Sequence, residues 1–252
     1  MNRCAFVTGG AVGIGRGIAL TLAQNGYDVA IHYHGSEAAA IEVQAQINAL
    51  GSHCELFCAD TARPEEVRAM FAAYRAAYPR LDLFIANAGV TKVKPFLEMD
   101  EGTFDLINGV DFKGTYFCVQ SACALMRNWS LRGSVVIIAS NNAFMKTPGA
   151  SVYGSVKMAL VKLTQHAAME VARYGIRVNC IAPGWTETTQ AGMPEKEKTF
   201  YQIPMKRWCT PSEIGQAALF LSGQWAQSIT GECLMMDGGA TLQTRPPEQY
   251  GL

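Results

Sequence analysis

The chain has 252 residues, of which 49% are hydrophobic and 17% charged, a balance that suits one sizeable α/β core without a disordered tail. Basic and acidic residues balance at 21 each, which argues against nucleic acid or an anionic membrane as partner and favours a small-molecule ligand. No secretory signal or membrane-spanning run precedes the strand-like Cys4 to Val7, so we expect a cytoplasmic protein. The eight cysteines form no Cys-x-x-Cys pair, which argues against disulfides and a metal site.

An apolar run over 3–8 leads into a glycine-rich turn and then into a helical pattern that ends near residue 25. Strand, glycine turn and helix in this order are the context of the dinucleotide fingerprint. The glycines let the backbone approach a pyrophosphate, and the helix N-terminus offers it unpaired N–H groups. The predicted cofactor contacts in this turn are Gly9, Gly13, Ile14 and Gly15; the alternative is a tight turn that holds no ligand.

The second strand, 29–33, ends at His34-Gly35-Ser36. An acid at this tip would bind the ribose hydroxyls of NAD and repel a 2′-phosphate. Because no acid stands there and His34, Gly35 and Ser36 can donate hydrogen bonds to a phosphate, the sequence favours NADP(H) over NAD(H). Glu37 is the residue that argues for NAD, although it also suits the first turn of a helix capped by Ser36. An ordinary surface histidine is the alternative role for His34.

Two further strand ends are expected to meet the cofactor. The third strand, 53–58, is followed by Asp60 and Thr61, and an acid here can accept from an adenine amino group; its alternative role is to cap the helix that begins near residue 64. The fourth strand, 81–86, runs into the small-residue turn Asn87-Ala88-Gly89, at the sheet edge where ligands of open α/β sheets bind.

Tyr153 and Lys157 lie four residues apart on a predicted helix and so share a face. A nearby ammonium favours the phenolate form of a tyrosine, which makes the pair suitable for proton transfer. On many ordinary helices the same spacing holds a merely solvated lysine. The pair gains weight from Ser140, which ends the buried strand-like run 135–140.

Two long helical stretches, 103–127 and 152–173, follow the fourth and fifth strands, and the second is apolar on much of its circumference, which predicts a subunit contact. A sixth strand, 176–181, precedes an irregular segment over 189–208, which we interpret as a substrate lid. Its candidate ligand-covering residues are Met193, Phe200, Tyr201, Ile203 and Met205; the alternative is that they pack a surface loop. With a last strand at 233–236, seven strands alternating with helices predict one parallel sheet covered on both faces.

Taken together, these motifs resemble the short-chain dehydrogenase/reductase family over essentially the whole chain. The matching residues are Thr8-Gly9-Gly10 with Gly13-Ile14-Gly15, Asn87-Ala88-Gly89, Ser140, Tyr153-x-x-x-Lys157, Arg177-Val178-Asn179, Pro183-Gly184 with Thr188, and Asp237-Gly238-Gly239. The resemblance implies a single Rossmann domain, 1–252, with strand order 3-2-1-4-5-6-7, and commonly a homotetramer formed through the helices at 103–127 and 152–173.

The resemblance also implies the roles of the site residues. Tyr153 would be the general acid or base on the substrate oxygen, Lys157 would favour its phenolate and bind the nicotinamide ribose, and Ser140 would hold the substrate oxygen. Pro183, Gly184 and Thr188 would hold the nicotinamide carboxamide, and Thr186 is a further expected cofactor contact. Members of the family often have a basic residue in the glycine turn, but this chain has Val12 there, which counts against NADP(H).

The implied reaction interconverts a secondary alcohol and a ketone by hydride transfer, with a 3-oxoacyl thioester or a hydrophobic, steroid-like ketone as expected substrate. A sugar or polyol substrate is the alternative, and a non-catalytic cofactor-binding sensor is a third possibility. One residue departs from the family pattern: Asp111 stands where an asparagine usually positions a water that connects the lysine to solvent. An aspartate can also hold a water, or pair with Lys157, so we expect activity with an altered pH profile. A plain turn acceptor within a kinked helix is the alternative role of Asp111.

Overall fold

The computed structural model describes residues 2–188 and 195–242, and within them seven parallel strands form one sheet in the order β3-β2-β1-β4-β5-β6-β7. The strands are β1 Arg3–Thr8, β2 Tyr27–Tyr33, β3 Leu56–Cys58, β4 Leu83–Ala86, β5 Ser134–Ile138, β6 Arg177–Pro183 and β7 Cys233–Met236. This is the predicted doubly wound topology. The order reverses between β1 and β4, which is where open α/β sheets bind their ligands.

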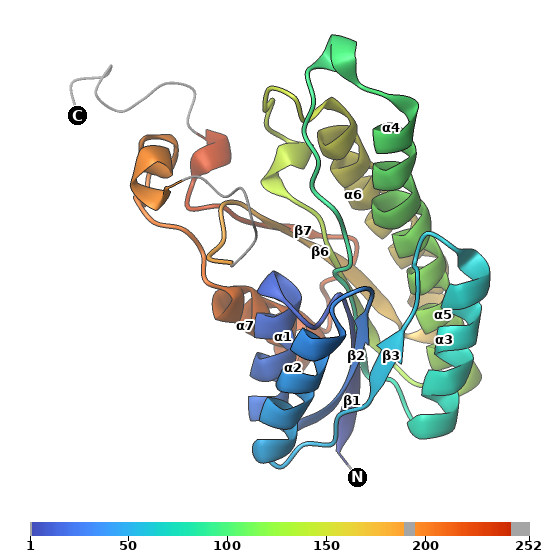
Figure 1. The fold of residues 1–252 in the computed structure, drawn as a ribbon. Coiled ribbons are helices and arrows are strands. Elements are labelled where there is room, and N and C mark those ends of the chain that lie inside the picture. Colours follow the sequence, from blue (N-terminus) through green and yellow to red (C-terminus); the bar gives the residue numbers. More distant parts are fainter. Residues whose placement is uncertain (1, 189–194, 243–252) are drawn as a thin grey trace.

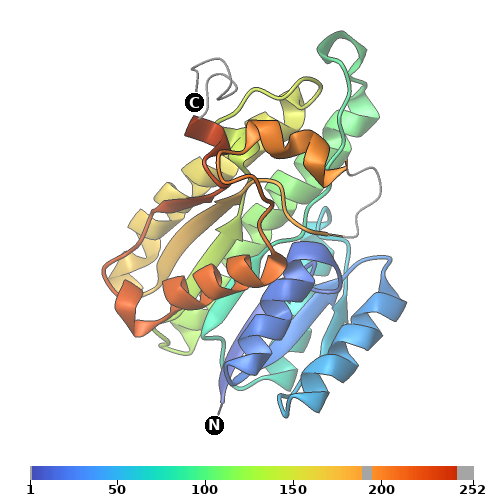
Figure 2. The ribbon, with the colours of Figure 1, turned by 90° about the vertical axis from the view of Figure 1, so that its left-hand side faces the viewer.

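Helices cover both faces of the sheet (Figure 1; Figure 2). One face carries α1 Gly13–Gln24, α2 Glu37–Ala49 and α7 Pro211–Ser222, and the other carries α3 Pro64–Ala77, α5 Thr115–Asn128 and α6 Ser151–Val171. Each face has its own apolar core: Ile18, Ile47 and Ile214 belong to the first, and Tyr74, Val119 and Leu160 to the second. Because the inner strands are buried on both faces, they read as continuous apolar runs.

The stretch predicted as one helix over 103–127 is three helical segments. Helix α4 Glu101–Ile107 passes through a π-helical segment, Asn108–Gly114, into α5. Gly114 sits so close to the Thr61 backbone that a Cβ there would lie 2.8 Å from the Thr61 carbonyl oxygen. The wide turn brings Gly114 against the β3 end and buries Asp111 on the inner side of the helix, and such π-bulges frequently occur at functional sites.

Neither of the two side-chain caps considered as alternatives is formed. Ser36 occupies the N-cap position of α2, but its side chain makes no capping bond, and the N-cap of α3 is Arg63 rather than Asp60. Asp60 instead accepts from the backbone N–H of Ala62 at 2.9 Å and pairs with Arg63 at 3.5 Å. Both side chains therefore stay at the carboxyl edge of the sheet.

Among the described residues, no helix is long and apolar enough to cross a bilayer. The same part of the chain brings together no group of three or more His, Cys, Asp or Glu side chains with the arrangement of a metal site.

Candidate active site

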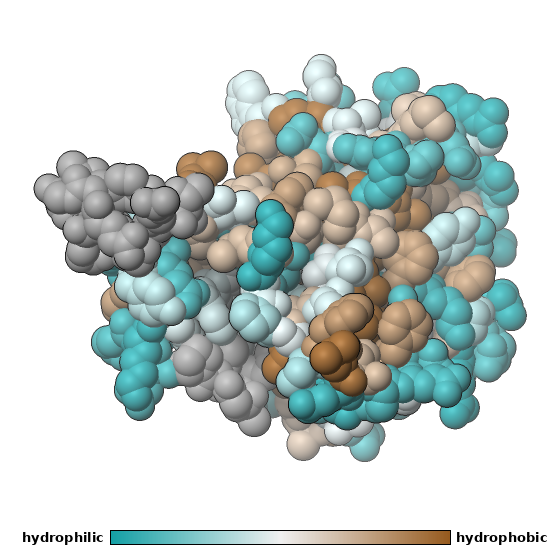
Figure 3. Space-filling view, turned by 90° about the horizontal axis from the view of Figure 1, so that it is seen from above, coloured by the Kyte–Doolittle hydropathy of each residue, from teal (hydrophilic) through white to brown (hydrophobic). Residues whose placement is uncertain are grey.

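A cavity of about 650 Å³ opens at the carboxyl edge of the sheet, above the point where the strand order reverses. Seen from that edge, the molecule carries hydrophobic side chains towards the middle and hydrophilic ones around the rim (Figure 3). The cavity brings together most of the predicted site: Gly9, Gly13, Ile14, His34, Ser36, Asp60, Thr61, Asn87, Ala88, Gly89, Asp111, Tyr153, Lys157 and Thr188.

The glycine turn presents an uncapped helix end to this cavity. Helix α1 begins after Val12, with no side-chain cap and no acid in its first turn, whereas α4 and α7 are capped by Asp100 and Thr210. Gly9 and Gly13 have φ of +63° and +54°, a conformation that side chains disfavour. The free N–H groups and the positive end of the helix dipole suit a pyrophosphate.

The Gly9 peptide is held from two sides. Asn87 Nδ2 donates to the carbonyl oxygens of Thr8 at 2.9 Å and of Gly9 at 3.1 Å, while the Gly9 N–H donates to His32 Nδ1 at 3.1 Å. The Thr8 hydroxyl in turn accepts from the N–H groups of Asn87 and Ala88, at 2.9 and 3.1 Å. The turn after β1 and the turn after β4 are thus joined into one rigid floor for the cavity.

At the tip of β2, His34 and Ser36 line the cavity, and Glu37 is not among the lining residues. The Glu37 carboxylate acts instead on the Tyr33 hydroxyl: burial, followed by the nearby Glu37 charge, raises the pKa of Tyr33. The polar residues that line the cavity after β2 and β3 are therefore His34, Ser36, Asp60 and Thr61, together with Tyr33 at the end of β2.

Tyr153, Lys157 and Asp111 form a chain of contacts at the other end of the cavity. Lys157 Nζ lies 2.9 Å from Asp111 Oδ2 and 5.3 Å from the centroid of the Tyr153 ring. Asp111 Oδ1 accepts from the Val90 N–H at 2.7 Å. Only 4% of Lys157 and none of Asp111 is exposed to solvent. The predicted pairing of Asp111 with Lys157 is confirmed.

This ion pair keeps a buried ammonium charged. Burial alone would lower the pKa of Lys157, but the Asp111 carboxylate, and after it Tyr153, act in the opposite direction, and the pKa of Lys157 is raised above its ordinary value. The site therefore holds a permanently paired cation beside the phenol.

Ser140 lies next to the cavity rather than in its lining, which includes the preceding Ile138 and Ala139. It caps the short 3-10 turn Asn141–Ala143, and its hydroxyl accepts from the Asn142 N–H at 3.2 Å. That turn packs on α6 so closely that a Cβ at Gly154 would lie 2.9 Å from the Asn142 carbonyl oxygen. Glycine next to Tyr153 thus allows the Ser140 turn to approach the tyrosine's helix.

Five other predicted cofactor residues do not line the cavity: Gly15, Gly35, Pro183, Gly184 and Thr186. Three of them have structural roles. A Cβ at Gly15 would lie 2.1 Å from the Gly9 carbonyl oxygen, and one at Gly184 would lie 2.7 Å from Asp237 Cβ. The buried Thr186 hydroxyl donates to the Gly184 carbonyl oxygen at 3.0 Å, so Gly15, Gly184 and Thr186 shape the turns behind the site.

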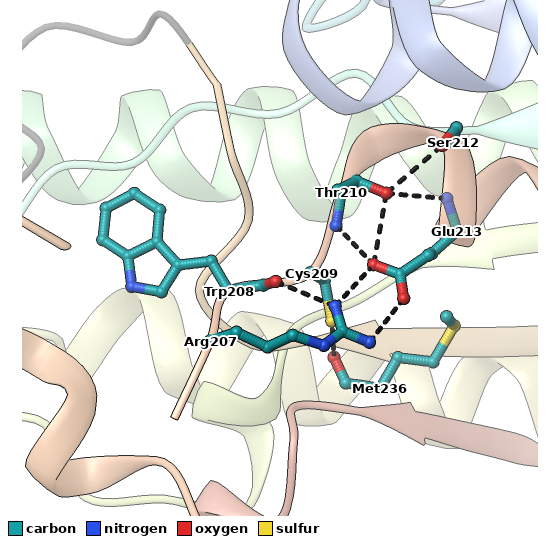
Figure 4. A network of polar contacts seen from close by, with 7 residues as sticks. All are labelled: Arg207, Trp208, Cys209, Thr210, Ser212, Glu213 and Met236. Carbon is teal, nitrogen blue, oxygen red and sulfur yellow. Dashed lines mark hydrogen bonds and ion pairs between the residues drawn. The ribbon is translucent and has the colours of Figure 1, made fainter. Parts of the chain in front are cut away.

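The described part of the predicted lid, 195–208, is anchored at its C-terminal end. The Arg207 guanidinium makes two hydrogen bonds to the Glu213 carboxylate, at 2.9 and 2.6 Å, and Glu213 also accepts from the Thr210 N–H (Figure 4). The Trp208 ring stacks on Trp185 with centroids 5.6 Å apart. These contacts fasten the segment to the start of α7 and to the turn after β6.

Of the residues predicted to cover a ligand, some pack inside the protein and others are exposed to solvent. Ile203 is buried with Trp208 and Ala240, and Phe200 packs against that cluster, whereas Tyr201 and Met205 are 51% and 62% exposed. None of these four lines the cavity, and Met193 lies outside the described residues. The role as a ligand cover stays a prediction.

The sequence analysis missed His32, which lies buried in the cavity wall. The available signal was a titratable side chain within the otherwise apolar strand 29–33, opposite Thr8 in the sheet register. It also missed Val90, Thr91, Leu106 and Val110 in the lining, because residues of the loop after β4, of α4 and of the π-helical segment reach the site only through the fold.

The arrangement matches known proteins over nearly its full length. A family model described as enoyl-(acyl carrier protein) reductase matches residues 9–241. The chain is 34% identical to the 3-oxoacyl-[acyl-carrier-protein] reductase FabG of Staphylococcus epidermidis, over 95% of this chain and 99% of that protein. It is 31% identical to an L-rhamnose 1-dehydrogenase (NAD(P)⁺) of a Sphingomonas species, over 94% and 96%.

A solved structure agrees with these relatives. The acetoin dehydrogenase YohF of Salmonella typhimurium superposes with a TM-score of 0.90 at 31% identity, covering 97% of this chain and 98% of that one. The family model, the relatives and this structure all match the part of the chain that contains the glycine turn, the Tyr153 helix and the strands between them. The chain therefore belongs to the short-chain dehydrogenase/reductase family, oxidoreductases that use NAD(P) to interconvert alcohols and carbonyl compounds.

Proposed function

We propose that this protein reduces a ketone to a secondary alcohol with NADPH, and that its substrate is a 3-oxoacyl thioester or another hydrophobic ketone. The observation that carries the cofactor preference is the β2 tip, where His34 and Ser36 line the cavity and the acid Glu37 does not. The substrate class is supported by the FabG relative, which is a 3-oxoacyl-[acyl-carrier-protein] reductase.

The cavity fits the dinucleotide by its donors: the uncapped start of α1 for the pyrophosphate, and His34 and Ser36 for a 2′-phosphate. When bound, the cofactor supplies the hydride. Tyr153 donates the proton to the substrate oxygen, Ser140 holds that oxygen, and Lys157 lends its charge to the phenol and binds the nicotinamide ribose. Asp111 keeps the Lys157 charge in place. In the reverse direction Tyr153 accepts the alcohol proton.

The second candidate is a sugar or polyol dehydrogenase, favoured by the L-rhamnose 1-dehydrogenase relative. A non-catalytic sensor is the third, and Ser140, Tyr153 and Lys157 all argue against it, because a protein that only binds the cofactor has no need of a proton-transfer group. We further propose a single-domain cytoplasmic protein whose exposed hydrophobic side chains on α4 to α6 make a homotetramer. These residues are Phe104, Leu106, Tyr116, Met158 and Met169.

The test begins with fluorescence titrations of NADPH and NADH. We expect NADPH to bind at least tenfold more tightly, about 1.4 kcal/mol, and His34→Ala to remove most of that difference without weakening NADH. His166→Ala, the same change on the exposed side of α6, is the matched control. If NADH binds as tightly as NADPH, or His34→Ala leaves the ratio unchanged, the proposed preference is wrong.

The substrate is tested next with the preferred cofactor on 3-oxoacyl thioesters, hydrophobic ketones, acetoin and a panel of sugars and polyols. Turnover of the thioesters or hydrophobic ketones at the highest kcat/KM supports the proposal. Preferred oxidation of L-rhamnose or another polyol would establish the second candidate, and cofactor binding without turnover of any compound would favour the sensor.

A further inference from the structure

The imidazole of His32 bridges two loops of the cofactor cavity. His32 stands near the carboxyl end of β2, opposite Thr8 of β1 in the sheet register, and only 2% of it is exposed. Its Nδ1 lies 3.1 Å from the Gly9 nitrogen in the glycine turn, and its Nε2 lies 3.0 Å from the carbonyl oxygen of Ala59, just past β3. One side chain thus connects the pyrophosphate end of the cavity with the segment that carries Asp60.

The hydrogen bonds fix the tautomer of this ring. The Gly9 N–H can only donate, so Nδ1 must accept and carries no proton. The remaining proton of the neutral ring is then on Nε2, which donates to the Ala59 carbonyl oxygen. A protonated ring would place a second donor against the Gly9 N–H, so the observed turn requires the neutral form.

The backbone of His32 also holds the glycine turn, because its carbonyl oxygen accepts a hydrogen bond from the Gly10 N–H at 3.0 Å. Asn87 holds the Gly9 carbonyl oxygen from the opposite side. Gly9 has φ of +63° in this turn, and a half-buried Gly9 N–H left without its acceptor would favour other conformations.

We propose that His32 is a positioning residue for the cofactor: its neutral Nε2–H tautomer holds the glycine turn in the shape that binds the dinucleotide pyrophosphate, and couples that turn to the adenine end of the cavity. His32 acts through Gly9 and Ala59 rather than on the reacting atoms. The inference rests on the proposed function only in taking a nicotinamide dinucleotide as the ligand.

Two amide variants separate the two bonds of the ring. In His32→Asn the amide oxygen can take the place of Nδ1 and accept from Gly9, and in His32→Gln the amide nitrogen can take the place of Nε2 and donate to Ala59. We expect His32→Asn to bind NADPH within about threefold of the unaltered protein and His32→Gln to bind it roughly tenfold more weakly, the effect of losing the hydrogen bond to the half-buried Gly9 N–H. In steady-state kinetics the KM for the cofactor should rise in His32→Gln with little change in kcat.

A second readout needs no cofactor. Hydrogen exchange at the Gly9 amide should stay slow in His32→Asn and become fast in His32→Gln, with both variants checked for folding by circular dichroism. Equal affinities and equal exchange in the two variants would overturn the positioning role. Failure of the unaltered protein to bind either nucleotide would instead overturn the proposed function, and the exchange experiment would still decide whether His32 holds the turn.

A pH series provides the third readout. Burial lowers the pKa of His32, with His34 acting in the same direction and the Ala59 bond and Asp60 acting against it. Because His34 also lines the cavity and acts on His32, the series is run in a His34→Ala background. Dinucleotide affinity should fall in that background as pH drops below the ordinary histidine range and stay flat when His32→Asn is added. The same decline with His32→Asn present would contradict the inference.

Discussion

Replacing Asp111 by asparagine should move the pH dependence of activity to lower pH. Asp111 and Lys157 form a buried ion pair beside Tyr153. The negative charge opposes the ionised phenol and so counteracts part of what the ammonium does for it. Asp111→Asn removes that charge with little change in shape, and the phenol then loses its proton at lower pH.

The size of the effect follows from the geometry. Asp111 Oδ2 lies 2.9 Å from Lys157 Nζ, which lies 5.3 Å from the Tyr153 ring centroid, so the carboxylate oxygen is within about 8 Å of the ring. A unit charge at about 8 Å in an effective dielectric of about 20 changes the energy of an ionised group by about 2 kcal/mol, or roughly 1.5 pH units. Allowing for water in the cavity, we expect a displacement of about one unit.

The assay is the pH profile of kcat/KM in both directions. Alcohol oxidation requires the phenolate and rises with pH, whereas ketone reduction requires the phenol and falls, and both midpoints should move down together in Asp111→Asn. Asp105→Asn, an equal change of charge at an exposed position of α4, is the control and should leave the midpoints in place. Thermal melts of both variants show whether the fold is kept.

Two results would refute this reasoning. An unchanged profile would mean that the Asp111 charge does not act on the phenol. A midpoint displaced to higher pH would mean that Lys157, deprived of its partner, has lost its own proton, since burial lowers the pKa of an unpaired lysine.

The same ion pair makes the stability of the unaltered protein depend on pH. Because the pKa of Lys157 is raised, the stabilisation by the ion pair is complete below the ordinary lysine pKa and is lost as pH rises through the raised value.

Three further outcomes are expected. Tyr153→Phe should lower kcat about 10²- to 10⁴-fold, the usual contribution of a general acid, while the Kd for NADPH from fluorescence titration stays within about threefold; retained turnover would exclude Tyr153 as the proton donor. Gly17→Ala should destabilise the protein by about 1 to 3 kcal/mol in urea titrations, because the new Cβ would lie 2.2 Å from Pro211 Cβ. The control, Gly102→Ala on α4, meets only Asp100 Oδ1 at 3.3 Å and should cause no such loss of stability. Equal effects of the two changes would mean that the α1–α7 contact tolerates the methyl group. The Arg207 hydrogen bonds lower the pKa of Glu213 to about 2, so the stabilising effect of the Glu213 carboxylate is complete above the ordinary glutamate pKa and is lost as pH falls through about 2. The difference in Tm between the unaltered protein and Glu213→Gln should therefore narrow from pH 6 to pH 3. A constant difference would show that the carboxylate charge is not what stabilises the segment.

The strands and most of the cavity could be predicted from the sequence because they depend on local patterns, whereas the order of the strands followed from the resemblance to the family. Each strand is a run of apolar residues, and the groups that meet at the carboxyl edge stand just after these runs, as Asn87 and Asp60 do. The position of Tyr153 and Lys157 on one face follows from helical spacing alone. Even the contact of Asp111 with Lys157 could be anticipated as a possibility from their charges.

Other features depend on contacts between distant segments. The π-helical turn that buries Asp111 forms where Gly114 meets the Thr61 backbone, and helical periodicity carries no sign of that approach. The apolar residues Phe200 and Ile203 suggested a ligand cover, and the structure packs them in a small cluster with Trp208 and Ala240, a residue from a distant part of the chain. Periodicity shows that a side chain will be buried without showing what will bury it.

The close contact of α1 with α7 has a consequence for how the binding of two ligands is coupled. Gly17 lets Pro211 sit directly on α1, four residues after its first residue, Gly13, which lines the cavity. Thr210 caps the start of α7, and Glu213 in its first turn secures the 195–208 segment through Arg207. A cofactor that settles on α1 and a substrate that settles under this segment would therefore act on one rigid pair of helices. By thermodynamic reciprocity, whatever factor the first ligand adds to the affinity of the second, the second returns to the first.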